Sequence, residues 1–178
     1  MFIVTGAEGS GKTTVMKELA KTLDFYWVRS VSTSVEEGPG LQRVGWEEYR
    51  RLAESDALEV SVQKRNALFG VTHDEIKLAL RSGKPVLWEV DLTSLENVKN
   101  DFPEARIILL NGIGIEDLYE RFENKGQMIS AAIGMKASVL NSLNKSWHDE
   151  VDFVVDNRKD AIGEAAQRIK EIVEGKSR

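Results

Sequence analysis

The chain has 178 residues, of which 42% are hydrophobic and 30% are charged, and its formal net charge is −5. These values are ordinary for one globular domain with a sizeable core, and the negative charge disfavours a nucleic-acid-binding protein. The absence of cysteine excludes disulfides, thiolate metal sites and a cysteine nucleophile. No apolar run approaches the about 20 residues of a membrane span, and no signal peptide precedes the first strand. We therefore expect a cytoplasmic protein that binds neither membrane nor nucleic acid, with its oligomeric state left open.

The first predicted element is a strand over residues 2–5, a short apolar run of β-prone residues. It leads into Gly6–Thr13, which reads G-x-x-x-x-G-K-T, the pattern of a phosphate-binding loop. A helix is predicted over residues 13–23, because the apolar residues there recur at helical spacing. Glycines let successive backbone N–H groups surround an anion, and the N-terminus of the helix adds positive potential. The sequence therefore predicts a site for a nucleoside triphosphate with Mg²⁺.

Within this loop, Lys12 can reach the β- and γ-phosphates, and the Thr13 hydroxyl suits a Mg²⁺ ligand position. The predicted nucleotide-binding residues of the loop and the first helical turn are Gly6, Ala7, Glu8, Gly9, Ser10, Gly11, Lys12, Thr13 and Thr14.

The middle region, roughly residues 33–70, does not follow the alternation of strands and helices seen on either side of it. A buried strand is predicted over residues 25–28, continued to Val35 by a hydroxyl-rich run, and a loop follows over 36–40. A short strand over 41–44 precedes a helix over 46–54, and residues 57–62 and 66–69 are predicted as antiparallel strands. Trp46, Tyr49, Leu52 and Ala53 are expected to share one face of this helix. We interpret residues 33–70 as an inserted, substrate-facing subdomain.

Alternation resumes with a helix from Thr72 to about Arg81, where Thr72 and Glu75 form a capping-box pattern. The remaining predicted elements are a strand over 85–91, a helix opening at Thr93 with a second capping box, a strand over 105–110, helices over 116–122 and 128–144, a strand over 153–155 and a helix over 161–173. Short strand–helix alternation implies right-handed crossovers and a parallel sheet.

The predicted fold is therefore a three-layer α/β phosphate-loop fold with about five parallel core strands, a small inserted subdomain and a helical lid. We predict a single domain over residues 1–178. Its core comprises residues 1–32, 71–122 and 138–178, its acceptor-binding insert residues 33–70, and its lid about residues 123–137. Ligands of such sheets bind at the carboxyl ends of the strands.

Two acidic residues end one of the predicted core strands. Glu89 and Asp91 are two apart, so both are expected to point to the same face. One carboxylate is a candidate to hold Mg²⁺ through water near Thr13, and the other to bind substrate. The alternative is a solvated strand end.

Cations and hydroxyls supply the other candidates. Arg121 and Lys125 lie four apart on one helix face, with Lys136 further along, as in a lid that brings positive charge to a transferring phosphate. The alternative is solvated helix charge. Hydroxyls of the run Ser30–Ser34 can bind a base edge or a phosphate, or can bond the local backbone. His73 and His148 are predicted as surface residues.

The order of these parts resembles guanylate kinase over about residues 2–173. The segments that carry the resemblance are the phosphate loop, Ser30–Ser34, Val44–Tyr49, Phe69–Thr72, Leu87–Asp91, Leu118–Gly126 with the spacing to Lys136, and Phe153–Asn157. The resemblance implies that Lys12, Arg121, Lys125 and Lys136 stabilise the phosphates and that Asn157 lies beside the adenine of ATP. It places Ser32, Asp91 and either Glu59 or Val60 where the family recognises guanine. The substrate-binding set becomes Ser32, Ser34, Glu59, Phe69, Glu89 and Asp91, with Thr13 and Glu89 as metal ligands.

The departures from the family gather at the acceptor phosphate. Glu36-Glu37-Gly38-Pro39 stands where the family has Arg-x-x-Arg, the following loop is shorter, and Phe69 replaces a tyrosine. A carboxylate facing a phosphate dianion is repulsive. Candidate replacement cations are Arg29, Arg43, Lys64 and Arg65, each of which is otherwise a solvated surface charge.

The leading hypothesis is an ATP-dependent kinase of a small nucleotide acceptor, with GMP or dGMP first and an altered (deoxy)nucleotide second. A kinase of a phosphorylated sugar is a related possibility. The competing class is a catalytically inactive guanylate-kinase-like module that binds protein. A nucleotide-hydrolysing switch is a third, weaker option.

Overall fold

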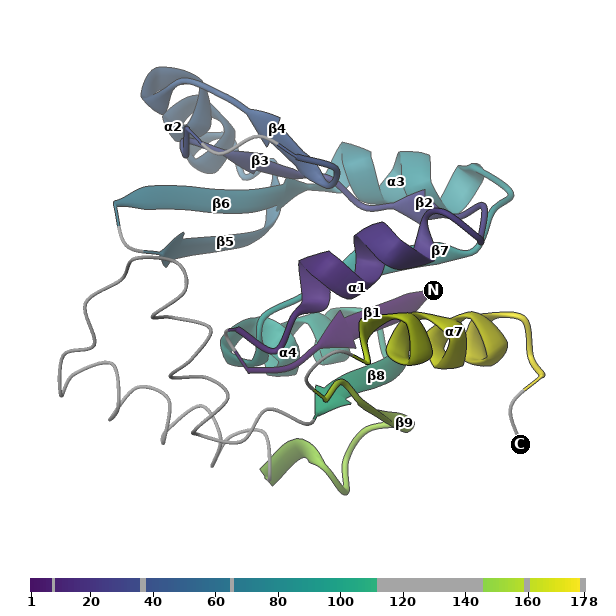
Figure 1. Ribbon diagram of the computed structural model, residues 1–178. Helices are drawn as coiled ribbons and strands as arrows, with labels where there is room; N and C mark the ends of the chain where they lie inside the picture. The colour runs from purple at the N-terminus through teal and green to yellow at the C-terminus, as the bar shows by residue number, and fades with distance from the viewer. Residues whose placement is uncertain (8, 36–37, 65, 112–145, 159–160, 177–178) are drawn as a thin grey trace, which may run out of the picture. The chain divides into compact units, whose positions relative to one another are not determined.

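The computed structural model describes residues 1–178 apart from 8, 36–37, 65, 112–145, 159–160 and 177–178. The chain divides into two compact units (Figure 1), which we call the loop unit (residues 2–23 and 89–178) and the insert unit (residues 24–88 with Met1). The helices 116–122 and 128–144 and the lid 123–137 predicted from the sequence lie outside the described residues.

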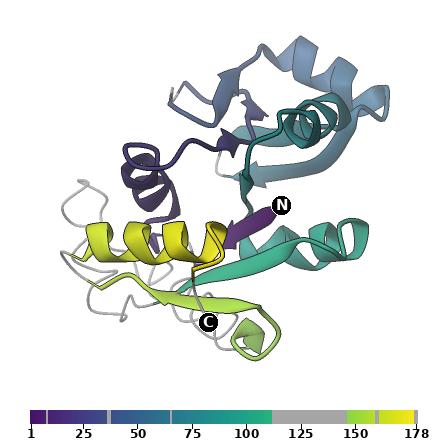
Figure 2. The same cartoon turned by 90° about the vertical axis from the view of Figure 1, so that its right-hand side faces the viewer.

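The loop unit contains β1 (Phe2–Thr5), α1 (Lys12–Leu19), α4 (Leu92–Asp101), β8 (Arg106–Asn111), β9 (Phe153–Asp156) and α7 (Ile162–Val173). Its strands β1, β8 and β9 pair in parallel, with Val4 in register with Ile108 and Leu109 with Val154. Ile3, Val4 and residues 107–110 are buried, because α1 and α7 lie on one side of β1 and β8 and α4 on the other (Figures 1 and 2). This arrangement puts the phosphate loop at the carboxyl end of β1.

The insert unit contains β2 (Tyr26–Trp27), β3 (Ser30–Ser32), β4 (Leu41–Arg43), α2 (Trp46–Glu54), β5 (Leu58–Lys64), β6 (Ala67–Thr72), α3 (His73–Arg81) and β7 (Val86–Glu89). The last residue of β7, Glu89, is assigned to the loop unit. Within the described residues, the strands form a five-stranded sheet in the order β2-β7-β1-β8-β9 and a four-stranded sheet in the order β4-β3-β6-β5. The predicted α/β fold with five parallel core strands and a small additional subdomain is confirmed.

The chain changes sheets between β2 and β3. Tyr26 and Trp27 pair in parallel with Val86 and Leu87, but Ser30–Ser32 pair with β4 and β6 of the small sheet. The predicted continuation of one strand from residue 25 to 35 is therefore wrong. The small sheet also takes in residues 30–32 and 71–72, which our sequence-based boundaries place in the core.

Helix limits differ from the prediction in α1, in α4 and, by one residue at its start, in α7. The first helix ends at Leu19 rather than Leu23, because residues 20–22 continue in tighter turns in which the Thr22 N–H donates to the Leu19 carbonyl. The predicted start of a helix at Thr93 is wrong: α4 begins at Leu92, with Asp91 as its N-cap residue. At α3, the Thr72 hydroxyl accepts from the Glu75 N–H, which confirms the predicted N-cap.

One face of the small sheet is covered by α2, whose limits match the prediction. Val31, Val44 and Tyr49 form a small core, against which Leu52, Leu58 and Leu68 pack. The Tyr49 hydroxyl lies 2.8 Å from Ser61 Oγ and donates to the Phe69 carbonyl, and burial raises the pKa of Tyr49. Of the four apolar residues expected on one face of α2, Tyr49 and Leu52 pack in this core, whereas Trp46 is 57% exposed and Ala53 is exposed as well.

Candidate functional site

The phosphate loop has a backbone that depends on glycine. Gly6 has φ +149°, and a Cβ there would lie 2.6 Å from the Leu110 carbonyl oxygen, closer than a methyl group allows. Gly11, the N-cap residue of α1, has φ +88°, in the left-handed region that other residues rarely adopt. Glycine at these two positions lets the chain turn from β1 into α1, whose first N–H groups have no partner within the helix.

The Lys12 side chain folds back onto the phosphate loop. Its side chain is 7% exposed, and its ammonium group donates to the carbonyl oxygens of Gly6 and Ala7 at 3.0 and 3.2 Å. The same nitrogen lies 3.9 Å from the Asp91 carboxylate. The loop therefore holds a positive charge at the helix N-terminus, which is the place where an anion is favoured.

Thr13 and Glu89 meet at the edge of the loop. The Thr13 hydroxyl donates to both carboxylate oxygens of Glu89, at 2.8 and 3.0 Å. Neighbouring oxygen ligands of an octahedral Mg²⁺ are about 3 Å apart, because each lies about 2.1 Å from the ion. The spacing and the chemistry of these oxygens therefore fit Mg²⁺. Among the described residues there is no cluster of three acidic or histidine side chains, so phosphates and waters would supply the remaining ligands.

Asn157 ties the end of β9 to the phosphate loop. Its side chain is fully buried, and its amide nitrogen donates to the Ser10 carbonyl at 2.6 Å. Its own N–H donates to the Asn111 carbonyl. Three side-chain oxygens beside the loop, those of Thr5, Ser10 and Asn157, are buried with no hydrogen-bond partner in the described structure. Asn157 thus contacts the loop backbone, a role that the resemblance did not suggest.

Asn157→Ala is expected to destabilise the chain and to raise the Kd for ATP. The substitution leaves the buried Ser10 carbonyl without its donor, which costs about 1–3 kcal/mol of unfolding free energy. Urea unfolding and calorimetric titration with ATP measure the two effects. Asn100→Ala, at an exposed position of α4, is the matched control and should change neither value. Equal behaviour of the two variants would contradict this assignment.

Three of the predicted substrate residues, Ser32, Glu59 and Phe69, lie on the small sheet, and Ser34 lies in the bend that follows β3. Arg43, Ser32, Phe69 and Val62 are register partners on β4, β3, β6 and β5, so their side chains share one face. We call this the acceptor face; Val31 and Tyr49 mark the opposite one. The Ser32 hydroxyl is buried and accepts from the Ser34 N–H at 3.0 Å, which is the local backbone bonding that the sequence left as an alternative.

Glu59 is paired with a residue that the sequence did not connect to it. Its carboxylate lies 2.8 Å from His73 Nδ1, and its side chain is 15% exposed. His73 Nε2 lies 3.1 Å from the Asp56 carbonyl. His73 and His148 are surface residues as predicted, with side chains 41% and 54% exposed. The contact depends on strand register, so no local signal could have indicated it.

Arg29 is unsuited to replace the missing phosphate-binding arginines. Its guanidinium donates to both carboxylate oxygens of Glu75, whose side chain is 9% exposed, and this hydrogen bonding raises the pKa of Arg29. The Tyr26 hydroxyl donates to the same carboxylate, and the pKa of Tyr26 is raised by burial and by Glu75. The charge of Arg29 is thus compensated within the unit.

Several predicted residues lie outside the part of the chain that the structure describes: Glu8, Arg121, Lys125 and Lys136, together with Glu36, Glu37 and Arg65. Glu89 and Asp91 are both brought to the phosphate loop, next to Thr13 and Lys12 respectively. No helix in the described ranges is long and apolar enough to cross a membrane.

A glycine-dependent loop between a parallel strand and a helix, carrying Lys12 and Thr13, defines a protein of the P-loop nucleotide-binding class. No protein-family model matches the chain. The guanylate kinase of Thermobifida fusca is 30% identical over 134 residues, which cover 71% of this chain and 67% of that protein. The guanylate kinase of Fusobacterium nucleatum is 26% identical over 180 residues, which cover 98% of this chain and 95% of that protein. The chain belongs to the guanylate kinase family.

A solved structure supports the fold. The crystal structure of guanylate kinase from Anaplasma phagocytophilum aligns with a TM-score of 0.73 at 20% identity, covering 99% of this chain and 85% of that one. The architecture described above is therefore that of a guanylate-kinase-like protein.

Proposed function

We propose that this protein is an ATP-dependent phosphotransferase that transfers the γ-phosphoryl group of MgATP to the phosphate of a small acceptor, a (deoxy)nucleoside monophosphate. The observation that carries the proposal is the pairing of Thr13 with Glu89 beside Lys12 in an intact phosphate loop. A metal-binding oxygen pair beside a loop cation suits a bound nucleoside triphosphate.

In the proposed reaction an acceptor phosphate oxygen attacks the γ-phosphorus in line with the bridging oxygen to the β-phosphorus. The new P–O bond forms, the bond to the bridging oxygen breaks, and ADP leaves. Lys12 and the N–H groups of the loop would hold the β- and γ-phosphate oxygens and offset their charge. Bound Mg²⁺, held by Thr13 and Glu89, would neutralise charge that develops on the phosphates.

The lid residues Arg121, Lys125 and Lys136 are assigned to the transferring phosphate by the family resemblance. Lysine at two positions keeps the positive charge but loses the bidentate fork of arginine. GMP and dGMP are the first acceptor candidates on the family relationship, and a phosphorylated sugar is a second kind.

The alternative is a protein-binding module without catalysis. Phe69, which lacks a hydroxyl, and Glu36-Glu37 favour this alternative because both weaken the family's acceptor-phosphate site. The Thr13–Glu89 pair and Lys12 oppose it, because protein binding alone does not require a metal-nucleotide site.

Acceptor-dependent release of ADP tests the proposal. The full chain is incubated with MgATP and, in turn, each common nucleoside monophosphate, its deoxy form and several sugar phosphates. Release of ADP with one acceptor class is the expected result. Binding of ATP without acceptor-dependent turnover across the panel would contradict the kinase and favour the binding module, whereas ADP release without acceptor would indicate a nucleotide-hydrolysing switch.

A further inference from the structure

The two edges of the acceptor face carry side chains of different chemistry, and strand register determines which side chains these are. Its central row begins with Arg43 on the edge strand β4 and ends with Val62 on the other edge strand, β5, with Ser32 and Phe69 between them. Arg43 is exposed and Val62 is half-buried. One edge of this face therefore offers a cation, and the other offers branched apolar side chains.

A β-bulge determines which residue of β5 is presented on this face. Leu58 is in register with Thr72, and Val60 is in register with Val71, so Glu59 is the extra residue between them. Adjacent residues of β6 point to opposite faces, and Leu58 packs in the core under α2. Val60 therefore points to the acceptor face. Without the bulge, residue 59 would take the register of Val71 and place a carboxylate there.

The displaced carboxylate is held by its own partner. The Glu59 carboxylate lies 2.8 Å from His73 Nδ1, and His73 Nε2 faces the Asp56 carbonyl at 3.1 Å. Each of the two ring nitrogens of His73 therefore lies within hydrogen-bond distance of an oxygen of the insert unit. The mostly buried side chain of Glu59 is engaged within the insert unit.

From this arrangement we infer that the acceptor is a phosphomonoester that places its phosphate at Arg43 and a donor-poor, apolar edge against Val60 and Val62. The inference rests on the proposed function and names the acceptor class of that site. Guanine presents an N1–H and a 2-amino group, and valine side chains cannot accept from either. Burying these donors without partners disfavours guanine relative to a base that lacks them.

The inference is tested by calorimetric binding of two matched ligands to the full chain. GMP is compared with purine riboside 5′-monophosphate, which has the same ribose phosphate but lacks the N1–H and the 2-amino group. Purine riboside 5′-monophosphate is expected to bind at least about tenfold more tightly. Equal binding, tighter binding of GMP, or no detectable binding of either ligand would overturn the inference.

Val60→Glu places a carboxylate on the acceptor face and is expected to shift the preference toward GMP by about tenfold or more. Gln63→Glu is the matched control, because Gln63 pairs with Leu68 and its side chain lies on the other face of the same strand. It adds the same charge and should leave the ligand preference unchanged.

If both variants shift the preference equally, the effect is one of net charge and the assignment of Val60 is wrong. If Val60→Glu does not fold, the wild-type comparison of the two ligands decides the question.

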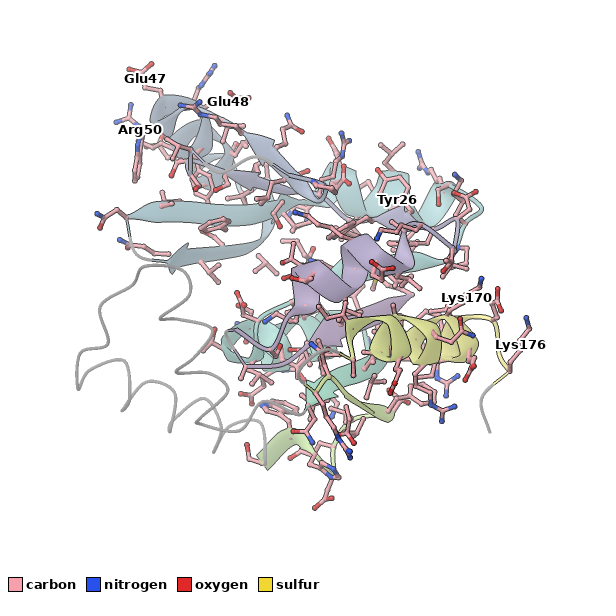
Figure 3. All side chains as sticks on the ribbon, viewed as in Figure 1. Tyr26, Glu47, Glu48, Arg50, Lys170 and Lys176 are labelled. Carbon is pink, nitrogen blue, oxygen red and sulfur yellow. The ribbon has the colours of Figure 1, made fainter. Side chains whose placement is uncertain are left out.

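Arg43→Gln tests the phosphate end. It is expected to weaken both monophosphates about tenfold or more while leaving the corresponding nucleosides unaffected. Arg50→Gln is the control, since Arg50 lies on the exposed side of α2 (Figure 3), where its guanidinium is paired with Glu54. Unchanged monophosphate binding in Arg43→Gln would overturn the assignment of Arg43.

These measurements need neither ATP nor turnover. A preference for purine riboside 5′-monophosphate without phosphoryl transfer to any acceptor would contradict the proposed function and leave the binding assignment intact. Transfer to GMP together with tighter GMP binding would support the proposed function and overturn the inference.

Discussion

Lys12→Ala is expected to lower kcat/KM for phosphoryl transfer by about 10²- to 10³-fold. The ammonium group of Lys12 is held at the loop by the Gly6 and Ala7 carbonyls, and in the proposed reaction it offsets charge on the phosphates. The substitution removes this positive charge from the loop. Coupled measurement of ADP release, with the acceptor that the panel identifies, gives the change directly.

Lys17→Ala provides the control for this experiment. Lys17 is exposed in the last turn of α1, so the substitution removes one positive charge from the same helix without touching the loop. Its transfer rate should remain close to that of the wild type. Wild-type transfer in Lys12→Ala would show that the phosphate loop is not the donor site.

Thr13→Val and Glu89→Gln are each expected to raise the Mg²⁺ concentration needed for half-maximal activity by about 10- to 100-fold. Valine keeps the shape of threonine but removes the oxygen that lies 2.8 Å from Glu89, and glutamine removes the negative charge. Activity titrated with Mg²⁺ measures the effect, and saturating Mg²⁺ should restore part of the lost rate. Chelation of Mg²⁺ should abolish transfer in the wild type.

The double variant tests whether the two residues hold one ion. If they do, the effects of Thr13→Val and Glu89→Gln are coupled and fall short of additivity. Thr93→Val, at an exposed position of α4, is the control and should not alter the Mg²⁺ requirement. Fully additive effects would indicate that Thr13 and Glu89 act separately.

Local patterns in the sequence were sufficient for the phosphate loop and for most helices and strands. The loop is recognisable because its conformation requires glycine at Gly6 and Gly11, and glycine is visible in the sequence. The limits of α2 and the N-cap at Thr72 also follow from short-range spacing. The approach of Glu89 and Asp91 to the loop is predictable because parallel strands bring their carboxyl ends to one edge of the sheet.

Contacts between distant parts of the chain could not be read in the same way. Sequence alone left open whether Glu59 or Val60 occupies the base-recognition position, and the β-bulge places Val60 on the acceptor face and Glu59 beside His73, 14 residues away. The pairing of Arg29 with Glu75 spans 46 residues, and the bond from Asn157 to Ser10 spans 147. Each of these contacts depends on strand register or on the approach of strand ends that are remote in sequence. Strand register and the approach of strand ends leave no periodic signal in the sequence. The conformation of the phosphate loop is therefore encoded locally, whereas the partners of Ser10, Arg29 and Glu59 are decided by tertiary structure.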